Sequence, residues 1–144
     1  MLNFVSKPSD RRLLQLLAAA TLCYWLVLTV LMHMPIPKRL HEPESGLPKD
    51  KTVHFILYAG FATALFLTFE QRARVRPNAA PRTRLGRVAV LFVICAVHGY
   101  LEEFTQPLSG RTYDLSDFAS DCFGASTALA ACLLVSRLRK PRTS

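Results

Sequence analysis

The chain has 144 residues, of which 51% are hydrophobic, and its formal net charge at pH 7 is +8. Charged and apolar residues are segregated along the sequence, whereas a soluble domain of this size interleaves them. The segregation argues against a nucleic-acid-binding surface, because Lys and Arg gather beside apolar stretches as they do at the ends of membrane helices. We therefore expect an integral membrane protein without a nucleic-acid partner.

Four apolar stretches occupy residues 13–34, 52–69, 86–104 and 117–136. At ~1.5 Å per residue, a helix of each length crosses or nearly crosses a hydrocarbon core of ~30 Å. Short connections favour an up-down-up-down arrangement of such helices. The sequence thus predicts an all-α fold, a four-helix antiparallel transmembrane bundle forming a single membrane domain over residues 1–144.

Basic residues are distributed unevenly over the tails and connections of this bundle. The two tails and the second connection, counted to Arg87, hold thirteen Lys and Arg, whereas the first and third connections hold five. Because cytoplasmic segments carry the excess of positive charge, we predict that both termini and the loop 70–85 are cytoplasmic. The loops 35–51 and 105–116 are then external.

A polar stripe marks the start of the second helix. Asp50, His54 and Tyr58 are four residues apart, so a helix places them on one face, and Lys51 adjoins them. His54 lies ~6 Å along the axis from Asp50, within reach of the external interface. Two interpretations of His54 stay about equally weighted: a hydrogen-bonded core residue, or a member of a site.

The third helix carries ionisable residues toward its external end. Such a group costs ~2.5–3.5 kcal/mol within a membrane helix, so it needs a partner or a purpose. Helical spacing places His98 beside Glu102, and Glu103 beside Gln106. The two pairs face somewhat different directions, so we do not expect both carboxylates to enter one site.

The fourth helix begins with three carboxylates spaced three and four residues apart, Asp114, Asp117 and Asp121. Either Asp114 or Ser116 can cap the helix, and acidic residues in a first turn suit its dipole. Capping does not explain Asp121, which lies about a turn deeper among apolar residues. We therefore predict that Asp121 points into the bundle.

Small residues continue the Asp121 stripe as Gly124 and Ala128. Such a face lets a neighbouring helix approach closely, so we assign both positions to helix packing. Just before the helix, Arg111 is the one basic residue of the third connection. Its guanidinium is expected either to form carboxylate forks with Asp114, Asp117 and Glu103 or to recognise an anionic headgroup.

These positions all fall at the predicted external side, so the sequence predicts one polar pocket there. Its candidate members are Asp50, Lys51, His54, Tyr58, Glu103, Gln106, Arg111, Asp114, Asp117 and Asp121. The first helix and the cytoplasmic ends show no comparable cluster. The residues near His54 offer no clean set of three metal ligands, so we expect no metal and no other cofactor, and we assign no catalytic residue.

Three blocks of these residues resemble the VanZ-like family of small bacterial membrane proteins. Residues 50–58 match its pattern D-K-x-x-H-F-x-x-Y, and residues 103–106 match E-x-x-Q. Residues 110–124 resemble G-R-x-x-D-x-x-D-x-x-x-N-x-x-G, with Asp121 where Asn is more frequent. In addition, Ala128 stands where a second Gly is common.

The likeness extends over about residues 20–135. It implies a multi-pass protein of the bacterial cytoplasmic (inner) membrane with a role at the cell envelope. The founding member of the family is associated with resistance to the glycopeptide teicoplanin, a property that does not transfer automatically to this chain. The resemblance implies no established reaction.

Three functions stay open. We favour a non-catalytic role in cell-envelope function or in the response to envelope-active compounds, with the pocket serving as a structural network or as a site for a membrane lipid, an anionic lipid or a cell-wall precursor. The alternative is a membrane enzyme acting on a phosphate-bearing lipid or lipid-linked cell-wall precursor, with His54 or Glu103 as acid/base and with Lys51 and Arg111 holding the anion. A proton or ion pathway is the third. Oligomeric state is not predicted.

Overall fold

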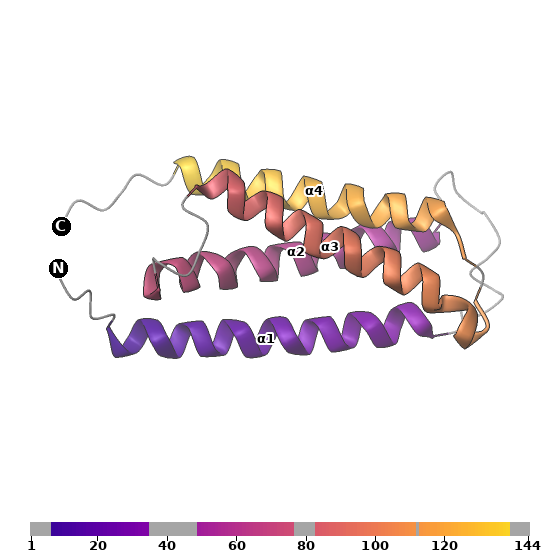
Figure 1. Ribbon diagram of the computed structural model, residues 1–144, viewed down its shortest axis with the longest axis horizontal. Helices are drawn as coiled ribbons and strands as arrows, with labels where there is room; N and C mark the ends of the chain where they lie inside the picture. Colours follow the sequence, from indigo (N-terminus) through magenta and orange to yellow (C-terminus); the bar gives the residue numbers. More distant parts are fainter. Residues whose placement is uncertain (1–6, 35–48, 77–82, 112, 139–144) are drawn as a thin grey trace.

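A computed structural model describes residues 7–34, 49–76, 83–111 and 113–138. Its elements, in chain order, are α1 (Pro8–His33), α2 (Lys49–Val75), α3 (Arg84–Thr105), the short 3-10 helix η3 (Gln106–Ser109) and α4 (Leu115–Leu138). Figure 1 shows the four long helices side by side and alternating in direction, with the start of α1 and the end of α4 at the same end of the bundle. The predicted all-α, four-helix antiparallel bundle is confirmed.

The helices are longer than the apolar stretches that predicted them. The second predicted span covers residues 52–69, whereas α2 begins at Lys49 and continues to Val75. The extra turns contain polar residues that favour helix and can project beyond a hydrocarbon core. Within the expected external loop 105–116, η3 and the start of α4 are helical. Most of the predicted loop 35–51 and part of the loop 70–85 lie outside the described residues.

The outer surface of the bundle is apolar. Large side chains such as Leu16, Val30, Phe123 and Leu134 are each at least 60% exposed. All four long helices have the length and apolar composition needed to cross a membrane. Such a surface is stable in lipid, because in water it would be a large apolar patch exposed to solvent.

A narrow core runs between the helices. It contains Leu28 and Met32 of α1, Tyr58, Phe61, Ala62 and Phe66 of α2, Leu91 and Cys95 of α3, and Ala125 and Leu129 of α4. Because lipid supplies no hydrophobic drive between helices, close packing must hold them together. At Gly124 of α4 the backbones themselves are in close contact, since an added Cβ would lie 2.2 Å from the backbone oxygen of Phe55 on α2.

The small-residue face predicted on α4 is therefore an interface with α2, as expected. Ala128, one turn further along α4, is partly buried against the core. This contact determines how α2 and α4 are rotated toward each other, and both helices carry polar residues on the same side. The polar residues of the two helices consequently meet at the end of the bundle away from Pro8 and Leu138 (Figure 1).

Candidate functional site

His54 of α2 lies at the centre of the polar residues. It is 1% exposed, and its Nδ1 lies 2.9 Å from Oδ1 of Asp121 on α4. Since a carboxylate accepts hydrogen bonds, this contact places the ring proton on Nδ1, which donates to Asp121. Asp121 itself is 1% exposed, so the prediction that it points into the bundle is confirmed.

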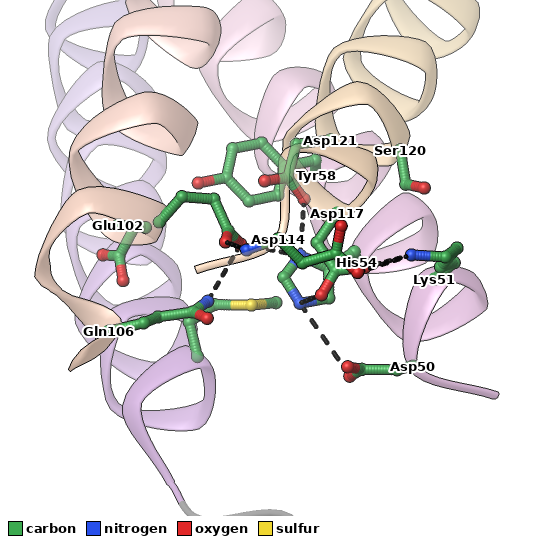
Figure 2. Close-up of polar contacts among 12 residues, drawn as sticks. Asp50, Lys51, His54, Tyr58, Glu102, Gln106, Asp114, Asp117, Ser120 and Asp121 are labelled. Carbon is green, nitrogen blue, oxygen red and sulfur yellow. Dashed lines mark hydrogen bonds and ion pairs between the residues drawn. The ribbon is translucent and has the colours of Figure 1, made fainter. Parts of the chain in front are cut away.

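Three further carboxylates surround the same imidazole. On the Nε2 side, Asp117 Oδ2 lies 3.8 Å away and Asp50 Oδ1 lies 3.9 Å away. On the Nδ1 side, Glu103 Oε1 lies 4.0 Å away. Figure 2 shows His54 between Asp121 on one side and Asp50 on the other. Helices α2, α3 and α4 thus all contribute a carboxylate to one buried histidine.

Helical spacing explains why these groups converge. Asp50 and His54 are one turn apart on α2, while Asp117 and Asp121 are one turn apart on α4, so each helix presents two groups in register. On α3, Gly99 leaves room for Asp121, since a Cβ there would lie 3.1 Å from Asp121 Oδ2. The small residues at the helix contacts therefore let the carboxylates reach the histidine.

Lys51 forms ion pairs with two carboxylates at the start of α4. Its Nζ donates to Asp114 Oδ2 at 3.1 Å and to Asp117 Oδ1 at 2.9 Å, and it also contacts Ser116 Oγ. Asp114 caps α4 through Oδ1, which accepts from the Ser116 N–H at 2.8 Å. Hydrogen bonds from the hydroxyl and the N–H of Ser116, together with Lys51, lower the pKa of Asp114 to about 2. Of the two predicted caps, Asp114 is the one used.

Arg111 has other partners than the sequence predicted. It donates to the backbone oxygen of Met32 at 2.9 Å and to Asp50 Oδ2 at 3.3 Å. The prediction that Arg111 forms carboxylate forks with Asp114, Asp117 and Glu103 is wrong. Lys51 binds Asp114 and Asp117, and Glu103 accepts a hydrogen bond from the Asp114 N–H. Arg111 instead ties the end of α1 to the start of α2.

Glu103 and Gln106 form the predicted pair. Gln106 Nε2 donates to Glu103 Oε1 at 2.9 Å, and both side chains are 0% exposed. The other carboxylate oxygen of Glu103 accepts from the Asp114 N–H at 3.1 Å. Glu103 therefore links the end of α3 to the residue that caps α4.

Together these residues form what we call the polar centre. Its members are Asp50, Lys51, His54, Glu103, Gln106, Arg111, Asp114, Asp117 and Asp121. Nine of the ten candidate residues of the sequence are thus brought together. Tyr58 is the tenth, and its hydroxyl hydrogen bonds elsewhere.

Tyr58 belongs to a second buried cluster between α1, α2 and α3. Its hydroxyl lies 2.8 Å from His98 Nδ1, and His98 Nε2 lies 3.2 Å from Glu102 Oε1. The second oxygen of Glu102 lies 3.0 Å from His33 Nδ1 at the end of α1. Figure 2 shows Glu102 apart from His54, so Glu102 and Glu103 do serve different clusters, as their spacing indicated.

Helix α1 contributes to the second cluster, which its sequence did not predict. We expected no polar cluster from the first helix, yet His33 meets Glu102, and its Nε2 lies 3.0 Å from Thr105 Oγ1. The available signal was a histidine at the end of an apolar stretch, at the same depth as the ionisable residues of α3. One residue of that kind has no visible partner within its own helix, so only packing could reveal its role.

Not every buried polar atom of the polar centre has a partner. Nε2 of His54, Oδ2 of Asp121 and Oε1 of Gln106 make no hydrogen bond. Two trios also bring ligand atoms within 4.8 Å of one another: Asp50, His54 and Asp117, and His54, Glu103 and Asp121. The expectation that no set of three ligands surrounds His54 is therefore wrong, because each trio combines residues from more than one helix.

Four membrane-spanning helices with a buried charged cluster at one end define a multi-pass integral membrane protein. Comparison of the chain with protein-family models, with curated proteins and with solved structures finds no match.

Proposed function

We propose that this chain is a VanZ-like protein of the bacterial cytoplasmic membrane with a non-catalytic role in cell-envelope function. Its polar centre is the working part and binds an envelope component. The observation that carries the proposal is His54, fully buried within a membrane-spanning helix and surrounded by carboxylates from three helices. Charged groups at such a depth are costly and are typical of a functional site.

The orientation we propose places the polar centre on the external side. The support is the excess of Lys and Arg in the tails and the second connection, which favours the cytoplasm for the opposite end. A cysteine introduced as Pro43→Cys, in a background without the four native cysteines, tests this. We expect a membrane-impermeant maleimide to label it in intact cells, and labelling only after lysis would contradict the orientation.

The partner we propose is an anionic lipid or a lipid-linked cell-wall precursor. Lys51 is the basic group of the polar centre that such a headgroup can reach, since its side chain is 31% exposed whereas that of Arg111 is 9% exposed. Both cations already contact carboxylates. An anionic headgroup therefore has to share Lys51 with Asp114 and Asp117, which favours reversible binding.

Genetic complementation tests the role. Cells that lack the gene receive the wild-type chain, the His54→Asn variant or the Glu70→Gln variant. Glu70→Gln is the matched control, because it removes a carboxylate at the opposite end of the bundle. Lipid-linked precursors and sensitivity to envelope-active compounds are measured at equal protein levels in the membrane. We expect the wild-type chain and Glu70→Gln to restore both, and His54→Asn to fail. Deletion without any change in either measurement would contradict an envelope role.

A second candidate function has one specific observation in its favour. The His54–Asp121 pair resembles the histidine–carboxylate arrangement of a general base, with Nε2 left unpartnered. An enzyme of this type would act on a phosphate-bearing lipid. Purified protein incubated with phosphatidic acid or a polyprenyl diphosphate distinguishes the two, because release of phosphate by the wild-type chain but not by His54→Asn would establish the enzyme.

A further inference from the structure

We propose that the polar centre holds one divalent transition-metal ion, bound by His54 Nε2, Asp50 Oδ1 and Asp117 Oδ2. This inference rests on the proposed function to the extent that it takes the polar centre to be a binding site. It names a ligand that the sequence did not predict.

The three proposed ligand atoms lie close together. Asp117 Oδ2 and Asp50 Oδ1 lie 3.8 Å and 3.9 Å from His54 Nε2, and all three atoms lie within 4.8 Å of one another. Ligands at ~2.0–2.2 Å from one ion are roughly 3 to 4 Å apart. Contraction by about 1 Å, within the reach of side-chain rotation, would therefore complete the site.

His54 has one ring nitrogen without a partner. Its Nδ1 lies 2.9 Å from Asp121 Oδ1, and Nε2 has no hydrogen-bond partner although the residue is 1% exposed. In the neutral ring that donates from Nδ1, Nε2 carries the lone pair that binds a metal ion. A buried polar atom without a partner is unfavourable, and a metal ion removes that cost. Metal-binding histidines regularly donate their other N–H to a carboxylate, which orients the ring. Asp121 is in the place that such a carboxylate occupies.

Basic side chains hold the two carboxylate ligands in place. Oδ1 of Asp117 accepts a hydrogen bond from Lys51 Nζ, and Oδ2 of Asp117 faces Nε2 of His54. Arg111 donates to both oxygens of Asp50, at 3.3 Å to Oδ2 and 3.4 Å to Oδ1, and Oδ1 also faces His54. A basic side chain thus holds each carboxylate ligand in place, as partners outside a metal site commonly do.

Charge points the same way. Five carboxylates surround two basic side chains among the described residues of the polar centre: Asp50, Glu103, Asp114, Asp117 and Asp121 against Lys51 and Arg111. Three of the five carboxylates, those of Glu103, Asp117 and Asp121, are buried. A divalent cation offsets negative charge collected at such a place.

The other trio is not the site we propose. It would use His54 Nδ1, which is already occupied by the hydrogen bond to Asp121. Glu103 in that trio also has a donor on each of its two oxygens, Gln106 and the Asp114 N–H. Binding there through one oxygen of Glu103 would affect two existing hydrogen bonds, the one between His54 and Asp121 and the one on that oxygen, whereas the Nε2 site leaves both in place.

The ligand set indicates which class of ion fits. One imidazole nitrogen with two carboxylate oxygens suits Zn²⁺ or Mn²⁺, whereas Ca²⁺ prefers oxygen ligands alone. Three protein ligands also leave coordination positions open. An oxygen of a lipid headgroup can occupy such a position, so the ion would supply the positive charge that an anionic partner needs.

Metal content of the purified protein tests the proposal. The full-length chain in lipid nanodiscs is stripped with a chelator, incubated with Zn²⁺ or Mn²⁺, freed of excess ion and analysed by mass spectrometry for bound metal. His54→Asn retains a donor for Asp121 but removes Nε2, and Asp117→Asn removes a ligand charge. Glu70→Gln, whose side chain contacts Arg87 at the opposite end, is the matched control.

We expect about one ion per chain for the wild type and for Glu70→Gln, with a thermal unfolding temperature that rises on metal addition. Both site variants should bind at least tenfold more weakly. Wild-type protein that binds neither ion, or His54→Asn that binds as well as the wild type, would overturn the proposal. If the site variants fail to fold, the wild type alone decides, because Co²⁺ bound through imidazole and carboxylates gives visible absorption bands that an empty site lacks.

These outcomes are separate from the test of the envelope role. A wild-type chain that binds no metal but still restores lipid-linked precursors in cells overturns the metal site and leaves the proposed function. A chain that binds metal but restores nothing upholds the metal site and contradicts the envelope role.

Discussion

Gly124 of α4 lies against the backbone of Phe55 on α2, so closely that an added Cβ would be 2.2 Å from the Phe55 carbonyl oxygen. The neighbouring atoms are backbone and cannot rotate away. This contact lies one turn from Asp121 on α4 and next to His54 on α2. It therefore controls the distance between His54 and Asp121 in the polar centre.

Gly124→Ala should therefore force α2 and α4 apart. Overpacking of this kind costs about 1 to 3 kcal/mol, of which alanine regains a part through its higher helix propensity. We expect a net loss of about 1 to 2 kcal/mol in the free energy of unfolding, measured by denaturant titration in detergent micelles. Ser126→Ala, an exposed position of the same helix, is the control and should change stability little.

Lys51→Met should leave the buried carboxylate of Asp117 without its cation. Removal of one partner of such a pair costs about 3 to 5 kcal/mol when both are buried, and we expect about 2 kcal/mol here because Lys51 is partly exposed. The free energy of unfolding is measured with a chelator present, so that no bound metal ion contributes to stability. In the background of Asp117→Asn the same substitution should cost less than half as much. Equal costs in both backgrounds would show that the ion pair does not stabilise the fold.

Tyr58→Phe should weaken the second cluster. The variant removes the hydroxyl that lies 2.8 Å from His98 Nδ1, and leaves a buried ring nitrogen without a partner. We expect a loss of about 1 to 2 kcal/mol in the free energy of unfolding. A double-mutant cycle with His98→Leu should give a coupling energy of about 1 kcal/mol, and additive effects would contradict a direct hydrogen bond.

Acid should remove the contribution of Asp114. Its pKa is lowered from the ordinary value of 3.8 to about 2 by the Ser116 hydrogen bonds and Lys51, so its ionised form stabilises the folded state. That stabilisation is present above pH 3.8 and is lost as the pH falls toward 2. The difference in unfolding temperature between the wild type and Asp114→Asn should therefore shrink over this interval. A difference that stays constant from pH 5 to pH 2 would contradict the lowered pKa.

Much of the fold could be predicted because it depends on local properties. Apolar length determines which segments cross a membrane, and helical periodicity determines which residues share a face, so the four helices and the Glu103–Gln106 pair follow from spacing alone. The close contact at Gly124 was visible for the same reason, as small residues one turn apart on a helix that carries Asp121. The helix ends were harder, because polar residues such as Glu70 and Arg72 extend α2 beyond its apolar part.

The sequence by itself predicted four membrane-spanning helices and ten charged or polar residues toward one end of them, nine of which the structure brings together in the polar centre. Only the tertiary structure decided their partners. Arg111 binds Asp50 rather than the carboxylates near the start of α4, and His33 contacts Glu102 across two helices. Two carboxylate oxygens, one from α2 and one from α4, lie near the same nitrogen of His54. Spacing along a chain constrains the angle between residues on one helix, whereas contacts between helices depend on their mutual rotation and depth. Those two quantities follow from packing, here from the approach of α4 to α2 at Gly124.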